Sequence, residues 1–293
     1  MTQFRWIPGV LVLVVIVLCV TVAQDSTAQR VIRKPSPTFE LDVLVNGRPV
    51  AEYYARGRTY IEAIQGAEYE LQVRNPSADR VAVALSVDGR IEEREIANAR
   101  EQTERLLGVV DELLAGARLE LTDLDGIAFG RGPGSFTGLR VSAAVAQGLA
   151  APSRLPLLPV SSLLCLAQRA LRSERVEHSV ACADAHMGEV YWGEFELRDG
   201  VLRAAGPERL GAPADLIPPS GSTWVAVGSG FAAQREALGA VLAKAQRALP
   251  ELEPAAQDLF PAAAEALAAG RASSPDKALP VYLREHTAWR RAD

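Results

Sequence analysis

Hydrophobic residues change their spacing along the chain, and each change predicts a different kind of structure. The chain starts with an unbroken apolar run from Val10 to Val22. From Pro35 to about Val73, short stretches of alternating apolar and polar residues follow, with Asn46-Gly47 between two of them. Because this pair tolerates positive φ, it is typical of the tip of a tight hairpin. We therefore expect a small β module over residues 35–80.

After residue 80 the pattern becomes that of an α/β protein. Val81 to Val87 and Arg90 to Ile96 are strand-like and flank the turn sequence Asp88-Gly89. A helical stripe over residues 100–119 follows, and then strand, helix, strand and helix alternate up to the end of "SSLLCLAQRAL". We expect lobe 1, over residues 81–175, to be a mixed sheet with helices on its faces.

A second unit follows over residues 176–293 and starts again with strands. The stretch "HSVACADAHMGEVYWGEFELRDGVL" predicts three strands, and "TWVAVGSGF" a further one. One helix is expected over residues 232–246, and another in "PAAAEALAAGRA". Two successive units of this kind predict a two-lobed or duplicated fold with its boundary near Glu174 to Glu177.

Composition limits the classes of function. The net charge of −5 disfavours a protein that binds nucleic acid through its own phosphate contacts. If a nucleic acid is involved, a partner protein would have to bind it. The cysteines, Cys19, Cys165 and Cys182, form no CxxC and are expected in the core, and the three histidines are too scattered for an HExxH pair. We expect neither a metal site nor a catalytic residue.

The apolar start has the features of a secretory signal peptide. A basic Arg5 precedes the run, and Thr21 and Ala23 are small residues suited to cleavage after Ala23. Residues 1–28 are therefore expected to form a signal peptide or, alternatively, an uncleaved signal anchor. Both interpretations predict export or membrane anchoring of the chain that follows.

The glycine-rich stretch "GIAFGRGPGSFTGLRVSAAVAQGLA", from Gly126 to Ala150, joins a predicted strand to a predicted helix. Glycines around Pro133 allow a sharp turn, and Ser135 or Thr137 can cap the helix, whose free N–H groups favour an anion. The spacing matches neither GxxxxGK[ST] nor GxGxxG with its downstream acid. Phosphate binding and a purely structural turn both remain open on this pattern.

Several motifs in order resemble one family. "GRGPGSFTGLR" with "VAQGLA", together with "DELL", "VSSLLCLAQ", "ADAHMGEVYWG", "VGSGF" and "PVYLR", is similar to the TsaB (YeaZ) family of tRNA threonylcarbamoyladenosine biosynthesis subunits. The resemblance extends from about Val81 to Arg284. It is more specific than any single glycine-rich loop, because the motifs occur in one chain in the same order.

The resemblance implies a two-lobed α/β fold of the actin/hexokinase/Hsp70 kind, with RNase H-like lobes and a degenerate nucleotide site. It implies a non-catalytic subunit that pairs with a TsaD homologue and, with a TsaE homologue, supports threonylcarbamoyl transfer to the adenosine beside the tRNA anticodon. Contact with tRNA would come only through the complex, ATP or ADP would sit at the partner interface, and a homodimer could form without the partner. Such a role is cytoplasmic, which conflicts with a leader.

Site residues follow from the same resemblance. The partner or nucleotide-edge loop comprises Arg131, Gly132, Pro133, Gly134, Ser135, Thr137, Gly138 and Arg140. Arg131 and Arg140 are the sharpest candidates, since guanidinium groups beside helix N–H groups suit an anionic partner; the alternative is a solvated or salt-bridged arginine. Asp184 and Glu189 match the second-lobe motif. Between these two acids, His186 stands where the family usually has arginine, and Met187, like Trp192, is expected in the core.

The chain departs from the family at its start. TsaB proteins normally begin with a strand of the form "ILAIDT", whereas "YELQVRNPSADR" precedes Val81 here. We expect lobe 1 to have a substituted first strand, as in a gene fusion, with "AEYELQV" pairing in its place. Two other functions stay open: an exported β-module protein with a relic TsaB-like region, and a glycoprotease-like peptidase.

Overall fold

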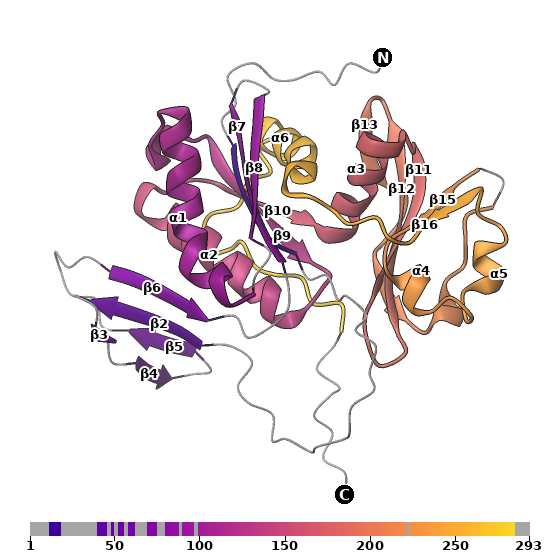
Figure 1. The fold of residues 1–293 in the computed structure, drawn as a ribbon, viewed down its shortest axis with the longest axis horizontal. Coiled ribbons are helices and arrows are strands. Elements are labelled where there is room, and N and C mark those ends of the chain that lie inside the picture. The colour runs from indigo at the N-terminus through magenta and orange to yellow at the C-terminus, as the bar shows by residue number, and fades with distance from the viewer. Residues whose placement is uncertain are drawn as a thin grey trace, which may run out of the picture.

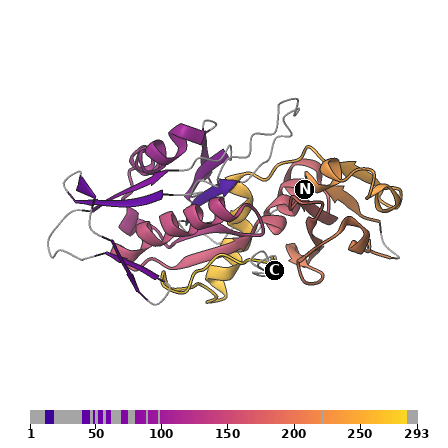
Figure 2. The ribbon, with the colours of Figure 1, turned by 90° about the horizontal axis from the view of Figure 1, so that it is seen from below.

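The computed structural model describes residues 12–18, 40–45, 48–49, 52–55, 58–61, 69–74, 80–87, 90–96, 99–220 and 223–284. Two α/β lobes lie side by side, and a small group of strands lies beside the first lobe (Figure 1). Figure 2 shows that the two lobes together form an elongated molecule.

Lobe 1 contains a five-stranded mixed sheet. Its strands are β1 (Val12–Leu18), β7 (Arg80–Val87), β8 (Arg90–Ile96), β9 (Gly126–Gly132) and β10 (Leu157–Ser161), in the order β10-β9-β1-β7-β8. β1, β7 and β8 are antiparallel neighbours, whereas β9 and β10 run parallel to β1. The hairpin expected around Asp88-Gly89 is confirmed, because β7 and β8 pair from Val87 and Arg90 outward.

Lobe 2 repeats this topology. Its strands are β11 (His178–Asp184), β12 (Val190–Arg198), β13 (Val201–Ala204), β14 (Arg209–Gly211), β15 (Val225–Val227) and β16 (Arg247–Leu249). The order β13-β12-β11-β15-β16 again places three antiparallel strands before two parallel ones, and β14 adds to β12. The predicted duplication is therefore present in the strand order of the two sheets.

Helices form layers on both faces of the two sheets (Figure 1). They are α1 (Ala99–Ala117), α2 (Phe136–Ser153), α3 (Ser162–Glu174), α4 (Gly230–Ala233), α5 (Gly239–Leu242) and α6 (Phe260–Ala268), with short 3-10 turns η1 (Leu121–Asp123), η2 (Pro213–Asp215) and η3 (Ala256–Leu259).

Alternation along the strands explains the layers. Ile127 and Phe129 of β9 pack with α1 and α2, whereas Ala128 points to the opposite face and packs with α3, η3 and α6. The other side of α3 packs on the lobe 2 sheet, whose far face packs with α4 and α5. α3 therefore lies between the two sheets and contributes to both cores.

Within the region expected to form the β module, the structure contains short strands. β2 (Glu40–Val45) pairs with β3 (Arg48–Pro49) across the Asn46-Gly47 position and with β6 (Tyr69–Arg74), while β4 (Glu52–Ala55) pairs with β5 (Arg58–Ile61). β6 lies beside α1 (Figure 1). In sequence, the module is inserted between the first and second strands of lobe 1.

The expected pairing of "AEYELQV" with the lobe 1 sheet is wrong. β6 pairs with β2 of the module, and residues 12–18 occupy the place of the first strand between β7 and β9. The sequence pattern gives the reason. A strand with neighbours on both edges and helices on both faces favours a continuous apolar run such as VLVVIVL, whereas the alternation of YELQVR suits a half-exposed sheet.

The prediction of a leader over residues 1–28 is not confirmed. Seven of these residues form β1 at the centre of the sheet, and cleavage after Ala23 would remove that strand. Among the described residues, no helix has the length and apolar character to cross a membrane.

The helix expected over residues 232–246 is also wrong. Two one-turn helices, α4 and α5, replace it, and β16 begins at Arg247. Gly239 stands in the middle of the expected helix, where glycine costs about 1 kcal/mol relative to alanine. The apolar spacing of this segment nevertheless serves the core, because Leu238 and Val241 are buried against the lobe 2 sheet.

Candidate functional site at the junction of the lobes

The glycine-rich turn connects β9 directly to α2. Ser135 is the cap of the helix, since its hydroxyl accepts a hydrogen bond from the backbone N–H of Gly138 at 3.4 Å. Thr137, the other capping candidate, lies within the first turn of α2. The capping hydroxyl therefore occupies part of the helix N-terminus that an anion would use.

Gly132 allows the turn to approach the C-terminal segment, residues 273–284. Its φ is +104°, and a Cβ at this position would lie 2.9 Å from the carbonyl oxygen of Val281 and 2.8 Å from Leu139 Cδ1. The backbone N–H of Val281 donates to the carbonyl oxygen of Arg131 at 2.8 Å. Close backbone packing thus requires glycine here.

The side chain of Arg131 points to a carboxylate from lobe 2. Its Nη2 lies 3.6 Å from Oε2 of Glu208, whose side chain is only 10% exposed. The other carboxylate oxygen, Oε1, accepts a hydrogen bond from the Ser161 hydroxyl, which also caps α3 by accepting from Leu164 N–H at 3.1 Å. Glu208 therefore neutralises Arg131 and links it to the end of β10.

The second-lobe motif forms the turn between β11 and β12. Asp184 stabilises this turn, because its carboxylate accepts from the backbone N–H of His186 at 3.0 Å. His186 and Met187 have positive φ values of 59° and 56°. Glu189 faces the C-terminal segment instead, with Oε2 2.6 Å from Nη1 of Arg284.

The structure thus brings together some of the predicted site residues and leaves others apart. The C-terminal segment contacts Arg131 through Val281 and Glu189 through Arg284, so the glycine turn and the second-lobe turn belong to one site. Arg140 is exposed on α2. Asp184 serves its own turn.

Sequence reasoning missed three residues of the site. Glu208 lies in none of the recognised motifs, and its ion pair with Arg131 forms only because the two lobes pack together. Val281 and Arg284 belong to "PVYLR", a motif found in the sequence without a role. A motif far from the glycine turn, with an arginine at its end, was the available signal.

One core prediction in this region is wrong and one is confirmed. Met187 is 88% exposed, because the turn carries it out from the sheet, while Trp192 is buried against the lobe 2 core.

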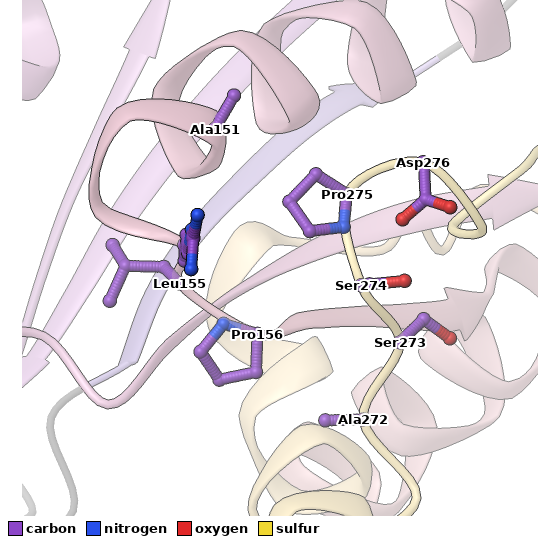
Figure 3. A pocket seen from close by; sticks show the side chains of 9 residues that line it. Ala151, Leu155, Pro156, Ala272, Ser273, Ser274, Pro275 and Asp276 are labelled. Atoms are coloured by element: carbon purple, nitrogen blue, oxygen red, sulfur yellow. The ribbon is translucent and has the colours of Figure 1, made fainter.

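A separate pocket of about 490 Å³ lies at the opposite end of α2 (Figure 3). Pro156 and Pro275 face it from two segments, and Arg154 and Asp276 add one charge of each sign. None of the predicted site residues lines it. The pocket is therefore distinct from the junction of the lobes.

At the junction, Arg131 and Arg284 are both paired with carboxylates. Within the part of the chain that the structure describes, no group of three His, Cys, Asp or Glu side chains could hold a metal ion. Cys165 and Cys182 are buried, and burial raises the pKa of both thiols. What the junction offers is a shaped turn, a neutralised arginine and an exposed Met187.

Comparisons with known proteins identify the family. A family model described as TsaD, tRNA N6-adenosine threonylcarbamoyltransferase, matches residues 95–290. The tRNA threonylcarbamoyladenosine biosynthesis protein TsaB of Escherichia coli K12 is 36% identical over 219 residues, which cover 73% of this chain and 94% of that protein. The chain belongs to the TsaB family. TsaB of Haemophilus influenzae is 35% identical and is covered over 93% of its length.

Solved structures agree with this assignment. YeaZ from Pseudomonas aeruginosa is 39% identical, with a TM-score of 0.63. The matched region covers 70% of this chain and 94% of the YeaZ chain. A second Pseudomonas aeruginosa structure, described as similar to peptidase YEAZ, gives 38% identity, a TM-score of 0.65 and the same coverage. The TsaB-like, actin/hexokinase/Hsp70-type α/β fold is thereby established for most of the chain.

Proposed function

We propose that this protein acts in the biosynthesis of threonylcarbamoyladenosine in tRNA, as a non-catalytic subunit that pairs with a TsaD homologue. The observation that carries the proposal is the 36% identity to a protein named for this pathway, over 94% of that protein's length. The match to the TsaD family model over residues 95–290 shows that the chain is related to the transferase with which we propose it pairs.

The arrangement of the junction supports a docking role rather than a catalytic one. Arg131 is neutralised by Glu208, and Ser135 caps α2, so neither side chain stands ready to bind a phosphate or attack a substrate. In this proposal the TsaD homologue carries out the transfer. The present chain supplies a rigid surface at the glycine turn, and tRNA, to which its charge of −5 is poorly suited, binds through the complex.

The finer parts of the proposal concern partners and place. A TsaE homologue joins the complex, ATP or ADP binds at the partner interface, and the protein forms a homodimer when its partner is absent. The role belongs in the cytoplasm, where tRNA is modified. The second-lobe residues Asp184 and Glu189 act by shaping and anchoring the turn beside this surface.

The two alternative functions have weaker support. A relic region would be expected to have lost parts of the family fold, whereas this chain covers 94% of the TsaB of Escherichia coli. A peptidase would need a reactive nucleophile, and the Ser135 hydroxyl is engaged as a helix cap.

The test is reconstitution with the TsaD and TsaE homologues of the same organism, supplied with ATP, threonylcarbamoyl-adenylate as the donor and unmodified tRNA as the acceptor, followed by mass spectrometry of nucleosides from the treated tRNA. We expect the full chain to co-purify with the TsaD homologue and threonylcarbamoyladenosine to form only when both are present. Arg131→Ala should weaken the pairing several-fold, while Arg154→Ala, at the other end of α2, should not. Failure of the wild-type chain to bind the TsaD homologue or to support the modification would refute the proposal.

A further inference from the structure

The last part of the chain is attached to lobe 1 at three successive points. Ser273 exchanges backbone hydrogen bonds with Leu157 of β10, each 2.8 Å long. The carbonyl oxygen of the fully buried Ala278 accepts from Gln147 of α2 at 2.9 Å, and Val281 donates to Arg131 at 2.8 Å. The yellow segment in Figure 2 follows lobe 1 toward the junction accordingly.

Arg284 then crosses to lobe 2. Its Nη2 donates to the carbonyl oxygen of Ala185 at 2.9 Å, and its Nη1 lies 2.6 Å from Glu189 Oε2 and 3.7 Å from Met187 Sδ. One guanidinium group thus contacts three residues of a single turn. The contact with Glu189 is an ion pair, and the contact with Ala185 is a hydrogen bond to a backbone carbonyl. Together they fix both the orientation of the turn and its distance from the C-terminal segment.

Arg131 is held from both sides of the junction. Its carbonyl oxygen accepts from Val281 of the C-terminal segment, and its guanidinium faces Glu208 of lobe 2. The glycine turn therefore cannot keep its position unless the C-terminal segment and lobe 2 keep theirs. α3 packs on both sheets and joins the lobes, while these directed polar contacts determine how the glycine turn and the second-lobe turn lie relative to each other.

We infer that residues 279–284 form a clasp between the lobes, with Arg284 as the positioning residue that holds the glycine turn in the arrangement presented to a partner. Opening the clasp at Arg284 frees the second-lobe turn and Val281, and with Val281 the backbone of Arg131. The expected consequence is local. Arg284 and Glu189 are partly exposed, and a single ion pair near the surface contributes little to global stability, so the protein stays folded when the clasp opens.

The experiment is hydrogen exchange by mass spectrometry on the full chain, comparing the wild type with Arg284→Ala. We expect exchange of peptides containing residues 131–135 and 185–190 to become about tenfold faster, because a local opening has become easier. Arg284→Lys retains the charge toward Glu189 but has a single donor group, and should fall between the two. Unchanged exchange in Arg284→Ala would overturn the inference.

Arg203→Ala is the matched control. Arg203 of lobe 2 pairs with Glu265 of α6 at 3.1 Å, so its loss also removes an arginine–glutamate contact between the lobes, but away from the clasp. We expect no change in the peptides of the glycine turn. Equal acceleration in both variants would show that any contact between the lobes has this effect, and the clasp would be rejected.

A second arm measures the affinity of the same variants for the TsaD homologue, and this arm rests on the proposed function. Arg284→Ala should bind several-fold more weakly than the wild type, while Arg203→Ala should bind normally. The two failures are distinguishable. If the wild type does not bind the TsaD homologue, the proposed function fails while the exchange result stands; if exchange is unchanged, the clasp fails whatever the affinity.

Discussion

Gly132 shows how much a single position contributes to the site. Its φ of +104° lies in a region that L-residues rarely adopt, and the carbonyl oxygen of Val281 occupies the space where a Cβ would be. Gly134, two residues later, has no such constraint, since a Cβ there would meet only Leu139 Cδ2 at 4.0 Å. Two glycines of one turn therefore have different roles, one required by backbone geometry and the other replaceable.

This difference predicts the effect of two matched substitutions. Gly132→Ala should lower the free energy of unfolding by about 1–3 kcal/mol, the cost of a strained backbone conformation. Gly134→Ala should change it by less than about 0.5 kcal/mol, as expected at a site without special constraints. Urea unfolding of both variants measures the difference. Equal effects would mean that the turn does not adopt this conformation.

At the scale of the element, β1 is the strand on which lobe 1 depends. It pairs along its whole length with β7 and over Val12 to Val15 with β9. A strand with two neighbours uses the hydrogen-bonding groups on both of its edges, so it is the least replaceable element of the sheet. In the sequence, the apolar pattern of these residues also predicts a leader. A leader and a central strand predict opposite effects of substitutions in this segment on stability.

Proline substitution separates these interpretations. Val15 is opposite Val83 and Phe129, and Val15→Pro should lower the free energy of unfolding by at least about 1–3 kcal/mol, because proline cannot donate to the sheet and leaves an acceptor of the neighbouring strand unpaired. Val12→Pro is the control, since proline is tolerated at the first residue of a strand. Thermal unfolding followed by circular dichroism gives the comparison. A wild-type melting curve for Val15→Pro would support the leader and remove residues 12–18 from the sheet.

At the scale of the whole molecule, the two lobes are joined through α3, which packs on both sheets. Among the described residues, each lobe also buries one thiol. Burial, with Asp258 and Glu93 nearby, raises the pKa of Cys165, and burial beside Asp184 raises that of Cys182. If the lobes unfold together, both thiols contribute to the pH dependence of a single transition.

The sign of this dependence follows from linkage. Above about pH 8.5, an unfolded thiol loses its proton while the folded one keeps it, so the free energy of unfolding falls as pH rises, by about 1.4 kcal/mol per pH unit for each thiol. Unfolding in denaturant between pH 8 and 10 should show this fall, with a shallower slope in Cys165→Ala and in Cys182→Ala. If one of these variants left the slope unchanged, the thiol that it removes would not be buried in the part of the protein that unfolds in this transition.

Much of the fold could be predicted from the sequence, and less of the site. The apolar spacing around Ile127 and Phe129 and the turn pair Asp88-Gly89 gave strands in the right places, because these signals are local. The apolar spacing over residues 232–246 predicted one helix across Gly239, whereas this glycine is the first residue of α5, the second of two one-turn helices. In the site, the glycine turn and its Ser135 cap were local features, whereas Glu208 came from another lobe without a motif.

The sequence alone determined the two-lobed α/β order, the position of the glycine turn and membership of a family, since periodicity, turn residues and ordered motifs depend only on neighbours along the chain. Only the tertiary structure decided the use of residues 12–18 as a central strand and the joining of Arg131 to Glu208 and Val281. The physical reason is that an apolar run suits a leader and a buried strand equally well. Which one it becomes, like the partner of a charged side chain, depends on contacts between residues far apart in the chain.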